Sequence, residues 1–174
     1  MIDLGIVIVN WNTRDELQKC LETVRASEGD ITMRVVVVDN ASTDDSADMV
    51  RERFPHVELI VSEINGGYSY ANNIGLRHLG YHRSAADVDP AAPRYALLLN
   101  PDTEVPPQSL AAMTAFMDSR PDVGMAGPKL LLPDGTLDKA CRRGFPTPTV
   151  SFYHFSGLAK LFPNNPRFAR YNMT

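Results

Sequence analysis

The sequence has little of what marks several protein classes. Its 174 residues contain two cysteines, Cys20 and Cys141, too few for a disulfide framework or a cysteine-based zinc site, and this usage fits a reduced, cytosolic compartment. Basic residues are not in excess, because 17 Lys and Arg stand against 21 Asp and Glu, so nucleic acid is not expected as a partner. The apolar run Ile6–Val9 is too short to span a bilayer, and no basic segment precedes it, so it does not indicate a signal peptide.

What the sequence does contain is typical of a folded α/β domain. Apolar residues make up 44% and charged residues 22%, which suits a chain with its own hydrophobic core. Short β-branched apolar runs alternate with stretches of helical spacing. Buried strands are expected at 6–9, 35–38 and 95–99, a further strand at 57–61 and shorter strands at 123–126 and 129–132. Helices are expected after Thr13, from Ser42 or Thr43 to Phe54, at 68–79 and at 106–119. This order predicts a mostly parallel sheet with helices on both faces.

Local signals mark the helix starts and the turns. Thr13 and Glu16 have the spacing of a capping box. The stretch 84–93, rich in Ala, Asp and Pro, is expected to be a surface loop, and Pro133-Asp134-Gly135 is expected to be a turn. Cys20 falls within a helical stretch and is expected to be a small core residue.

The character of the chain changes near Phe145. Residues 1–145 carry the alternating pattern and are predicted to be a ligand-binding domain, whereas residues 146–174 form an aromatic and proline-rich segment without periodicity. Because the chain closes without a capping element, it is expected to be truncated before a further region.

Polar residues follow each of the four main apolar runs. They are Asn10-Trp11-Asn12, Asp39-Asn40-Ala41-Ser42-Thr43-Asp44, Asn65-Gly66-Gly67-Tyr68 and Asn100-Pro101-Asp102-Thr103. Ligands of open parallel sheets bind beyond the carboxyl ends of the strands, so these segments are the candidate site.

Each candidate has a functional and a structural interpretation. Asp39 can accept hydrogen bonds from a base or a ribose, or it can cap the next helix; since Ser42, Thr43 and Asp44 could also cap, Asp39 is expected to be free. Gly66-Gly67 can approach a phosphate closely or form a tight turn. Asp102 can hold a divalent cation or stabilise a turn.

Together these four segments resemble the nucleotide-sugar-binding half of glycosyltransferase family 2, which has the GT-A fold, and in particular its rhamnosyltransferase-like members. The resemblance implies that Asp39 binds the nucleobase and that Val9, Asn10 and Asn12 line the nucleoside pocket. Further site residues that it implies lie near the ribose and phosphates or in the D-x-D motif: Gly67, Asn72, Asn73, Asn100 and Asp102.

The same resemblance implies a cofactor, with two departures from the family pattern. Asp102 corresponds to the carboxylate that coordinates Mg²⁺ or Mn²⁺ on the diphosphate. Asn100 replaces the first Asp of the D-x-D motif, which leaves one carboxylate fewer for the metal. Asn72 stands where Arg is frequent, so phosphate neutralisation would depend on the metal and on backbone N–H groups.

The implied function is an inverting transfer of a sugar, rhamnose by preference, from a nucleoside-diphosphate sugar to a hydroxyl of a saccharide or lipid-linked acceptor in cell-surface polysaccharide synthesis. The implied location is cytoplasmic, at the inner face of the membrane, with peripheral membrane association of the full-length protein. The family's general base is expected beyond Thr174, so this chain is expected to bind donor and to turn over poorly.

Two alternatives belong to other classes. One is a non-catalytic module that binds a nucleotide sugar or a protein, for which the aromatic segment would be the partner surface. The other is a dinucleotide-dependent oxidoreductase, which is disfavoured because Asn10-Trp11-Asn12-Thr13 stands where a glycine-rich turn is required.

Overall fold

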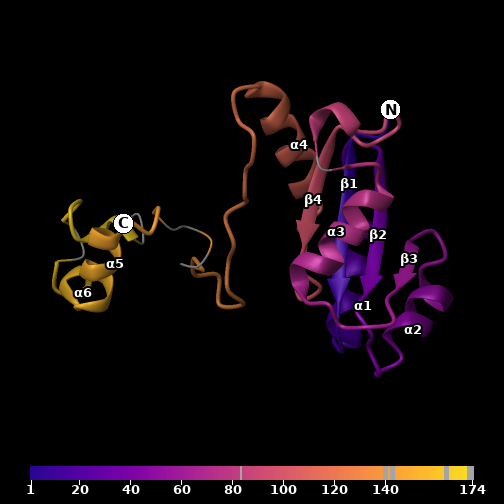
Figure 1. The fold of residues 1–174 in the computed structure, drawn as a ribbon, viewed down its shortest axis with the longest axis horizontal. Coiled ribbons are helices and arrows are strands. Elements are labelled where there is room, and N and C mark those ends of the chain that lie inside the picture. Colours follow the sequence, from indigo (N-terminus) through magenta and orange to yellow (C-terminus); the bar gives the residue numbers. More distant parts are fainter. Residues whose placement is uncertain (83, 139–140, 142–143, 163–164, 172–174) are drawn as a thin grey trace. The chain divides into compact units, whose positions relative to one another are not determined.

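The computed structural model describes residues 1–174 except 83, 139–140, 142–143, 163–164 and 172–174. The chain divides into two compact units, Met1–Asp122 and Val123–Thr174. Figure 1 shows the first unit as a sheet with helices packed against it and the second as short helices. The boundary at 145, expected from the change in composition, stays a prediction about where the ligand-binding part ends.

The first unit is built on a four-stranded parallel sheet. Its strands are β1 (Leu4–Asn10), β2 (Met33–Asp39), β3 (Glu58–Val61) and β4 (Tyr95–Leu99), in the order β3-β2-β1-β4. The predicted parallel sheet is therefore confirmed. The expectation that the fourth strand is buried is wrong, because β4 lies at an edge and Leu98 is 44% exposed.

Helices cover both faces of this sheet, as predicted. They are α1 (Arg14–Arg25), α2 (Ser46–Arg53), α3 (Tyr68–His78) and α4 (Ser109–Ser119). Side chains alternate along a strand, so Ile6 and Ile8 enter one apolar cluster with α1, α2 and α4, while Val7 and Val9 enter a second cluster with α3. Cys20 belongs to the first cluster and is fully buried, as expected.

Close contact between α3 and the sheet depends on Gly75. A Cβ at this position would lie 2.4 Å from Cγ1 of Val7 and 3.3 Å from Cγ2 of Val38. The missing side chain lets the helix backbone approach β1 and β2, and this packing fixes the start of α3 relative to the ends of those strands.

Several predicted helix starts are displaced. The capping box does not form, because the Thr13 side chain makes no cap hydrogen bond to α1. The second helix begins at Ser46 rather than after Ser42 or Thr43, and the fourth begins at Ser109, after a turn over Pro106–Gln108. The loop at 84–93 is confirmed and contains only the short 3-10 helix η1 (Ala85–Asp87).

The second unit contains α5 (Pro148–Phe155), α6 (Leu158–Leu161) and the 3-10 helix η3 (Ala169–Tyr171). The strands expected at 123–126 and 129–132 are wrong, since the only pairing described there is an isolated bridge between Leu131 and Leu137. The turn predicted at Pro133-Asp134-Gly135 is confirmed: Gly135 N–H donates to the Leu132 carbonyl at 2.8 Å, and Gly135 has φ +80°.

Candidate functional site

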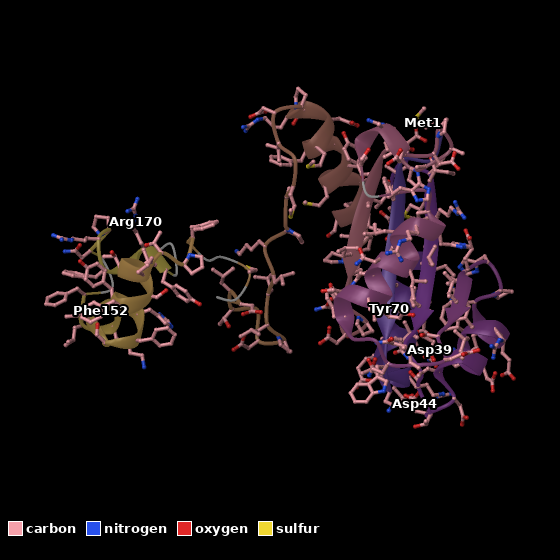
Figure 2. The ribbon with its side chains drawn as sticks, viewed as in Figure 1. Met1, Asp39, Asp44, Tyr70, Phe152 and Arg170 are labelled. Carbon is pink, nitrogen blue, oxygen red and sulfur yellow. The ribbon has the colours of Figure 1, made fainter. Side chains whose placement is uncertain are left out.

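The candidate site lies where the parallel strands end. Asn10 and Asp39 are the last residues of β1 and β2, and they are paired in register. Both side chains are buried, at 0% and 1% exposure. Figure 2 shows Asp39 and Asp44 at the end of the sheet opposite Met1. This is the carboxyl edge, where open parallel sheets bind their ligands.

The buried Asp39 carboxylate has a partner on each oxygen. The Asn10 side-chain amide donates to Oδ1 at 2.9 Å, and the backbone N–H of Ser42 donates to Oδ2 at 3.0 Å. The expectation that Asp39 would be free of hydrogen bonds to neighbouring loop residues is therefore wrong. Each carboxylate oxygen can accept more than one hydrogen bond, so the group still has acceptor capacity for a ligand.

Ser42 connects the loops that follow β1 and β2. Its Oγ accepts hydrogen bonds from the Asn10 side chain and from the Asn12 backbone, both at 3.0 Å. In return, Oδ1 of Asn12 accepts from the Thr43 backbone N–H at 2.8 Å. From the sequence, Ser42 is expected only as a helix cap, so this role was not predicted; the signal for it is the position of Ser42 three residues after Asp39.

These two loops also hold strained backbone. Asn12, Ala41 and Asp45 have φ values of 54°, 64° and 61°, and they are the only non-glycine residues with positive φ in the described part of the chain. Left-handed backbone at residues with a Cβ costs energy and persists where the surroundings enforce it, frequently in binding loops.

Asp44 fixes the same loop to the start of α1. Its Oδ2 accepts from the backbone N–H of Arg14 at 2.9 Å, and its Oδ1 accepts from both the N–H and the hydroxyl of Ser46. Although partial burial raises the pKa of Asp44, the hydrogen bonds from Ser46 and Arg14 hold that pKa below its ordinary value. Thr13 instead donates from Oγ1 to Oδ1 of Asn10 at 2.7 Å.

A third loop joins this arrangement through two asparagines. The Asn40 side chain donates to Oδ1 of Asn65 at 2.7 Å and accepts from the Gly66 N–H at 3.2 Å. Oδ1 of Asn65 also accepts from the Gly67 N–H at 3.0 Å. Gly67 has φ +83°, which disfavours any residue with a Cβ, and it immediately precedes α3. The neighbouring loop therefore holds this helix start in position.

The two consecutive asparagines of α3 have different environments. Asn72 is 4% exposed, and its side chain donates to the Tyr68 carbonyl one turn earlier at 3.0 Å. Asn73 is exposed. Val9 is buried in the apolar cluster under α3. The predicted contacts of these three residues with a ligand stay predictions.

Asn100 and Asp102 lie on the loop after β4, on the other side of β1 from Asp39. Both residues are exposed. Asp39 ends β2 and Asp102 follows β4, and β1 lies between these two strands. The axes of β2 and β4 are therefore about 10 Å apart. The parallel pairing of both strands with β1 brings their following loops to one edge of the sheet.

Two side chains of helix α1 contact the loop that contains Asp102. The Cys20 thiol lies 3.7 Å from the Asn100 carbonyl, and Oγ1 of Thr23 accepts from the Val105 N–H at 3.0 Å. Burial raises the pKa of the Cys20 thiol to about 12, and the Asp102 carboxylate acts in the same direction. The thiol is therefore a neutral packing group close to a carboxylate.

The metal-binding capacity of this edge rests on one carboxylate. Among the described residues, no group of three or more His, Cys, Asp and Glu side chains is placed to hold an ion. Mg²⁺ and Mn²⁺ sites on nucleotides use one or two protein carboxylates together with phosphate oxygens, so an exposed Asp102 fits that mode of binding. A hollow of about 300 Å³ lies elsewhere, lined by Lys19, Glu22, Thr23, Ala26 and Glu104, and includes none of the predicted site residues.

Comparison with known families agrees with this geometry. The model of glycosyl transferase family 2 matches residues 5–130, which include β1 from its second residue, the other three strands and all four polar loops. The chain belongs to glycosyltransferase family 2. The family resemblance expected from the sequence is thus confirmed.

Named relatives in the family include two bacterial proteins. The N-acetylglucosaminyl-diphospho-decaprenol L-rhamnosyltransferase of Mycobacterium tuberculosis is 28% identical over 164 residues, which cover 94% of this chain and 52% of that protein. The succinoglycan biosynthesis protein ExoO of Rhizobium meliloti is 30% identical over 118 residues, or 67% of this chain and 30% of that protein. The chain therefore spans about half, or less, of the length of these relatives.

Solved structures agree on the fold. S. aureus TarS superposes with a TM-score of 0.55 at 18% identity, covering 76% of this chain and 24% of that chain. TarS 1-349 in complex with UDP-GlcNAc gives a TM-score of 0.55 at 19% identity, covering 77% and 42% of the two chains. The first unit thus has the GT-A, Rossmann-like fold. No helix in the described ranges combines the length and hydropathy needed to cross a bilayer.

Proposed function

We propose that the carboxyl edge of the sheet binds a nucleoside-diphosphate sugar, and that the protein transfers the sugar with inversion to a hydroxyl acceptor. The observation that carries the proposal is the buried Asp39 carboxylate, held at the end of β2 by Asn10 and Ser42. Its remaining acceptor capacity suits a nucleobase N–H, and the loops around it are connected by hydrogen bonds.

The diphosphate is proposed to lie between the start of α3 and the Asp102 loop. A helix N-terminus attracts phosphate, and α3 has no acidic residue in its first turn. Asp102 would hold the Mg²⁺ or Mn²⁺, and Asn100 precedes it by two residues on the same exposed loop. When bound, the cation supplies Lewis-acid stabilisation of the departing diphosphate.

The sugar and the acceptor are proposed from the similarity of this chain to a named relative. The Mycobacterium relative is named as an L-rhamnosyltransferase acting on a diphospho-decaprenol acceptor. We propose rhamnose as the transferred sugar and a lipid-linked saccharide as the acceptor, at the cytoplasmic face of the membrane during cell-surface polysaccharide synthesis. Deprotonation of the acceptor hydroxyl requires a general base. The expectation that this base lies beyond Thr174 stays a prediction.

Calorimetric titration with dTDP and UDP in the presence of Mn²⁺ tests donor binding. The wild type is expected to bind at least one of the two nucleotides, and Asp39→Ala is expected to bind it at least tenfold more weakly. Asp48→Ala, on the exposed surface of α2, is the matched control and should bind like the wild type. Circular dichroism of each variant verifies folding. If a folded Asp39→Ala protein binds as tightly as the wild type, base recognition by Asp39 is wrong.

A further inference from the structure

Charge is distributed unevenly between the two units. Residues 1–122 contain 10 Lys and Arg against 19 Asp and Glu, whereas residues 123–174 contain seven Lys and Arg against two Asp. Beyond Asp138 the sequence has six basic residues and no acidic one. A chain with an overall charge of −4 thus ends in a strongly basic segment.

The same segment is rich in aromatic residues, and some of them form a small core. Tyr153 packs edge-on against Phe168 with ring centroids 4.8 Å apart, and Phe162 lies 5.5 Å from the same ring. His154 and Tyr171 are 4.1 Å apart. These contacts join α5 to the segment that contains η3, so the unit has packing of its own.

Other apolar side chains of this unit face solvent. Phe152 and Phe155 are three residues apart on α5, which puts them on one side of the helix, and they are 62% and 84% exposed. Leu161 of α6 is 72% exposed. Exposed apolar patches mark sites of interaction with another molecule or a membrane, and the two phenylalanines on one side of α5 are the start of such a patch.

The same unit also has exposed basic side chains. Lys160, Arg167 and Arg170 are all exposed, and no ion pair that the structure describes involves them. Figure 2 labels Phe152 and Arg170 on this unit. We use the name α5–α6 surface for the exposed apolar residues Phe152, Phe155 and Leu161 of α5 and α6 together with the exposed basic residues of the same unit, Lys160 of α6, Arg167 before η3 and Arg170 within η3.

We propose that the α5–α6 surface binds an anionic phospholipid bilayer. Exposed aromatic rings partition into the boundary between headgroups and acyl chains, and lysine and arginine gain from a negative surface potential. The charge distribution favours this partner over an uncharged one, because the basic groups of the surface have no acidic neighbours in sequence. The proposal deepens the lipid-linked acceptor of the proposed function and rests on it for its biological role, but vesicle binding itself requires neither donor nor acceptor.

Vesicle co-sedimentation of the full chain tests the proposal. The protein is expected to bind vesicles of about one part phosphatidylglycerol to two parts phosphatidylcholine. With vesicles made only of phosphatidylcholine, the protein is expected to stay in the supernatant. Raising NaCl from about 0.1 M to about 1 M should release it, because the Debye length falls from about 10 Å to about 3 Å.

Two sets of variants separate the charged from the apolar contribution. The triple variant Lys160→Glu, Arg167→Glu, Arg170→Glu should lower the vesicle partition coefficient on the order of a hundredfold or more. The double variant Phe152→Ser, Phe155→Ser should lower it at least about tenfold, because both rings are exposed and would otherwise insert. Arg77→Glu, on exposed α3 of the first unit, is the matched charge control and should bind like the wild type.

Nucleotide titration of the same variants keeps this test distinct from that of the proposed function. Unchanged dTDP or UDP affinity with lost vesicle binding supports the proposal, and vesicle binding by a chain that binds no nucleotide supports it as well. Equal binding to neutral and anionic vesicles overturns it. The absence of vesicle binding also overturns the proposal. In that case, a concentration-dependent dimer that is seen by sedimentation velocity and disappears in the phenylalanine variant would assign the exposed rings to a contact between two copies of the chain.

Discussion

The side-chain amide of Asn10 donates a 2.9 Å hydrogen bond to Oδ1 of Asp39 across the ends of two neighbouring strands. Both residues are buried, and their strands are paired in register at this position. The carboxylate is therefore oriented by the fold itself, before any ligand arrives. Oδ1 of Asn10 accepts from Thr13, so one amide orients both the carboxylate and the start of the next loop.

Replacing Asn10 with alanine should destabilise the first unit. The change leaves a buried carboxylate without one of its two donors, and loss of a partner to a buried polar group costs about 1–3 kcal/mol, and more when the group is charged. Urea unfolding measures the difference. Asn73→Ala, on the exposed side of α3, is the control and should leave the unfolding free energy within about 0.5 kcal/mol of the wild type. Equal stability of the two variants would show that the Asn10–Asp39 contact is not formed in solution.

Replacing Asp102 with asparagine should remove the effect of metal on nucleotide binding. Because one carboxylate is proposed to hold the cation, its neutralisation should lower the affinity for a nucleoside diphosphate at least about tenfold when Mn²⁺ is present. Without metal, the affinities of variant and wild type should agree. Calorimetry with and without Mn²⁺ measures both, and Glu104→Gln in the same loop is the matched control. An Mn²⁺ enhancement that survives in the Asp102 variant would contradict the assignment.

Glu58 should make stability depend on pH in the acidic range. Arg34 donates to both of its carboxylate oxygens and His78 contacts one of them at 2.6 Å. Arg34 first, and then His78, lower the pKa of Glu58 from 4.5 to about 2, although partial burial opposes them. The folded pKa is the lower one, so the stabilisation is complete above about pH 4.5 and is lost as the pH falls toward 2.

The variant Glu58→Gln tests this dependence. It should be less stable than the wild type at pH 7 by about 1 kcal/mol, a modest figure because the group is partly exposed to solvent. The difference should shrink as the pH is lowered through the interval between 4.5 and 2. Chemical unfolding at several pH values measures it, with Glu63→Gln as the control. A difference that is constant over this interval would refute the ion-pair explanation.

Replacing Gly75 with alanine should weaken the packing of α3. The new methyl would meet Cγ1 of Val7 at 2.4 Å, and a buried β-branched side chain cannot turn away easily. Overpacking costs about 1–3 kcal/mol, which exceeds the gain of about 0.5–1 kcal/mol from helix propensity. Thermal and urea unfolding measure the net loss.

Two further variants identify the cause of that loss. Gly124→Ala meets nothing within 4 Å and should be neutral. In the Gly75→Ala background, Val7→Ala should cost less than it does in the wild type, because the two side chains compete for one space. Additive effects of Val7→Ala and Gly75→Ala would argue against the clash.

Much of the architecture could be read from local patterns. The valine run 35–38 and the run 95–99 predict strands because short continuous runs of β-branched or leucine residues are typical of them. The helix at 68–79 and its ending near Gly80 were predictable for the same kind of reason. The position of each strand within the sheet was not predictable, because an apolar run in a central strand looks the same as one in the edge strand β4.

The location of the candidate site was predicted from the sequence, but its hydrogen-bond network was not. Polar residues after apolar strands mark the carboxyl edge, because parallel strands end together there. Which donor meets which acceptor depends on register and loop conformation. The cap of α1 comes from Asp44, 30 residues away, rather than from Thr13, and no local pattern encodes that contact.

The sequence by itself determined the order of strands and helices in the first unit, the family and the set of polar groups at the strand ends, because periodicity and residue type act over short stretches of chain. Only the tertiary structure decided that β1 lies between β2 and β4, that Asn10 and Ser42 hold the Asp39 carboxylate, and that Ser42 joins two loops rather than capping a helix. The contacts of Asn10 with Asp39 and of Ser42 with Asn12 join residues about 30 positions apart, and they exist only once strand pairing has brought the segments together.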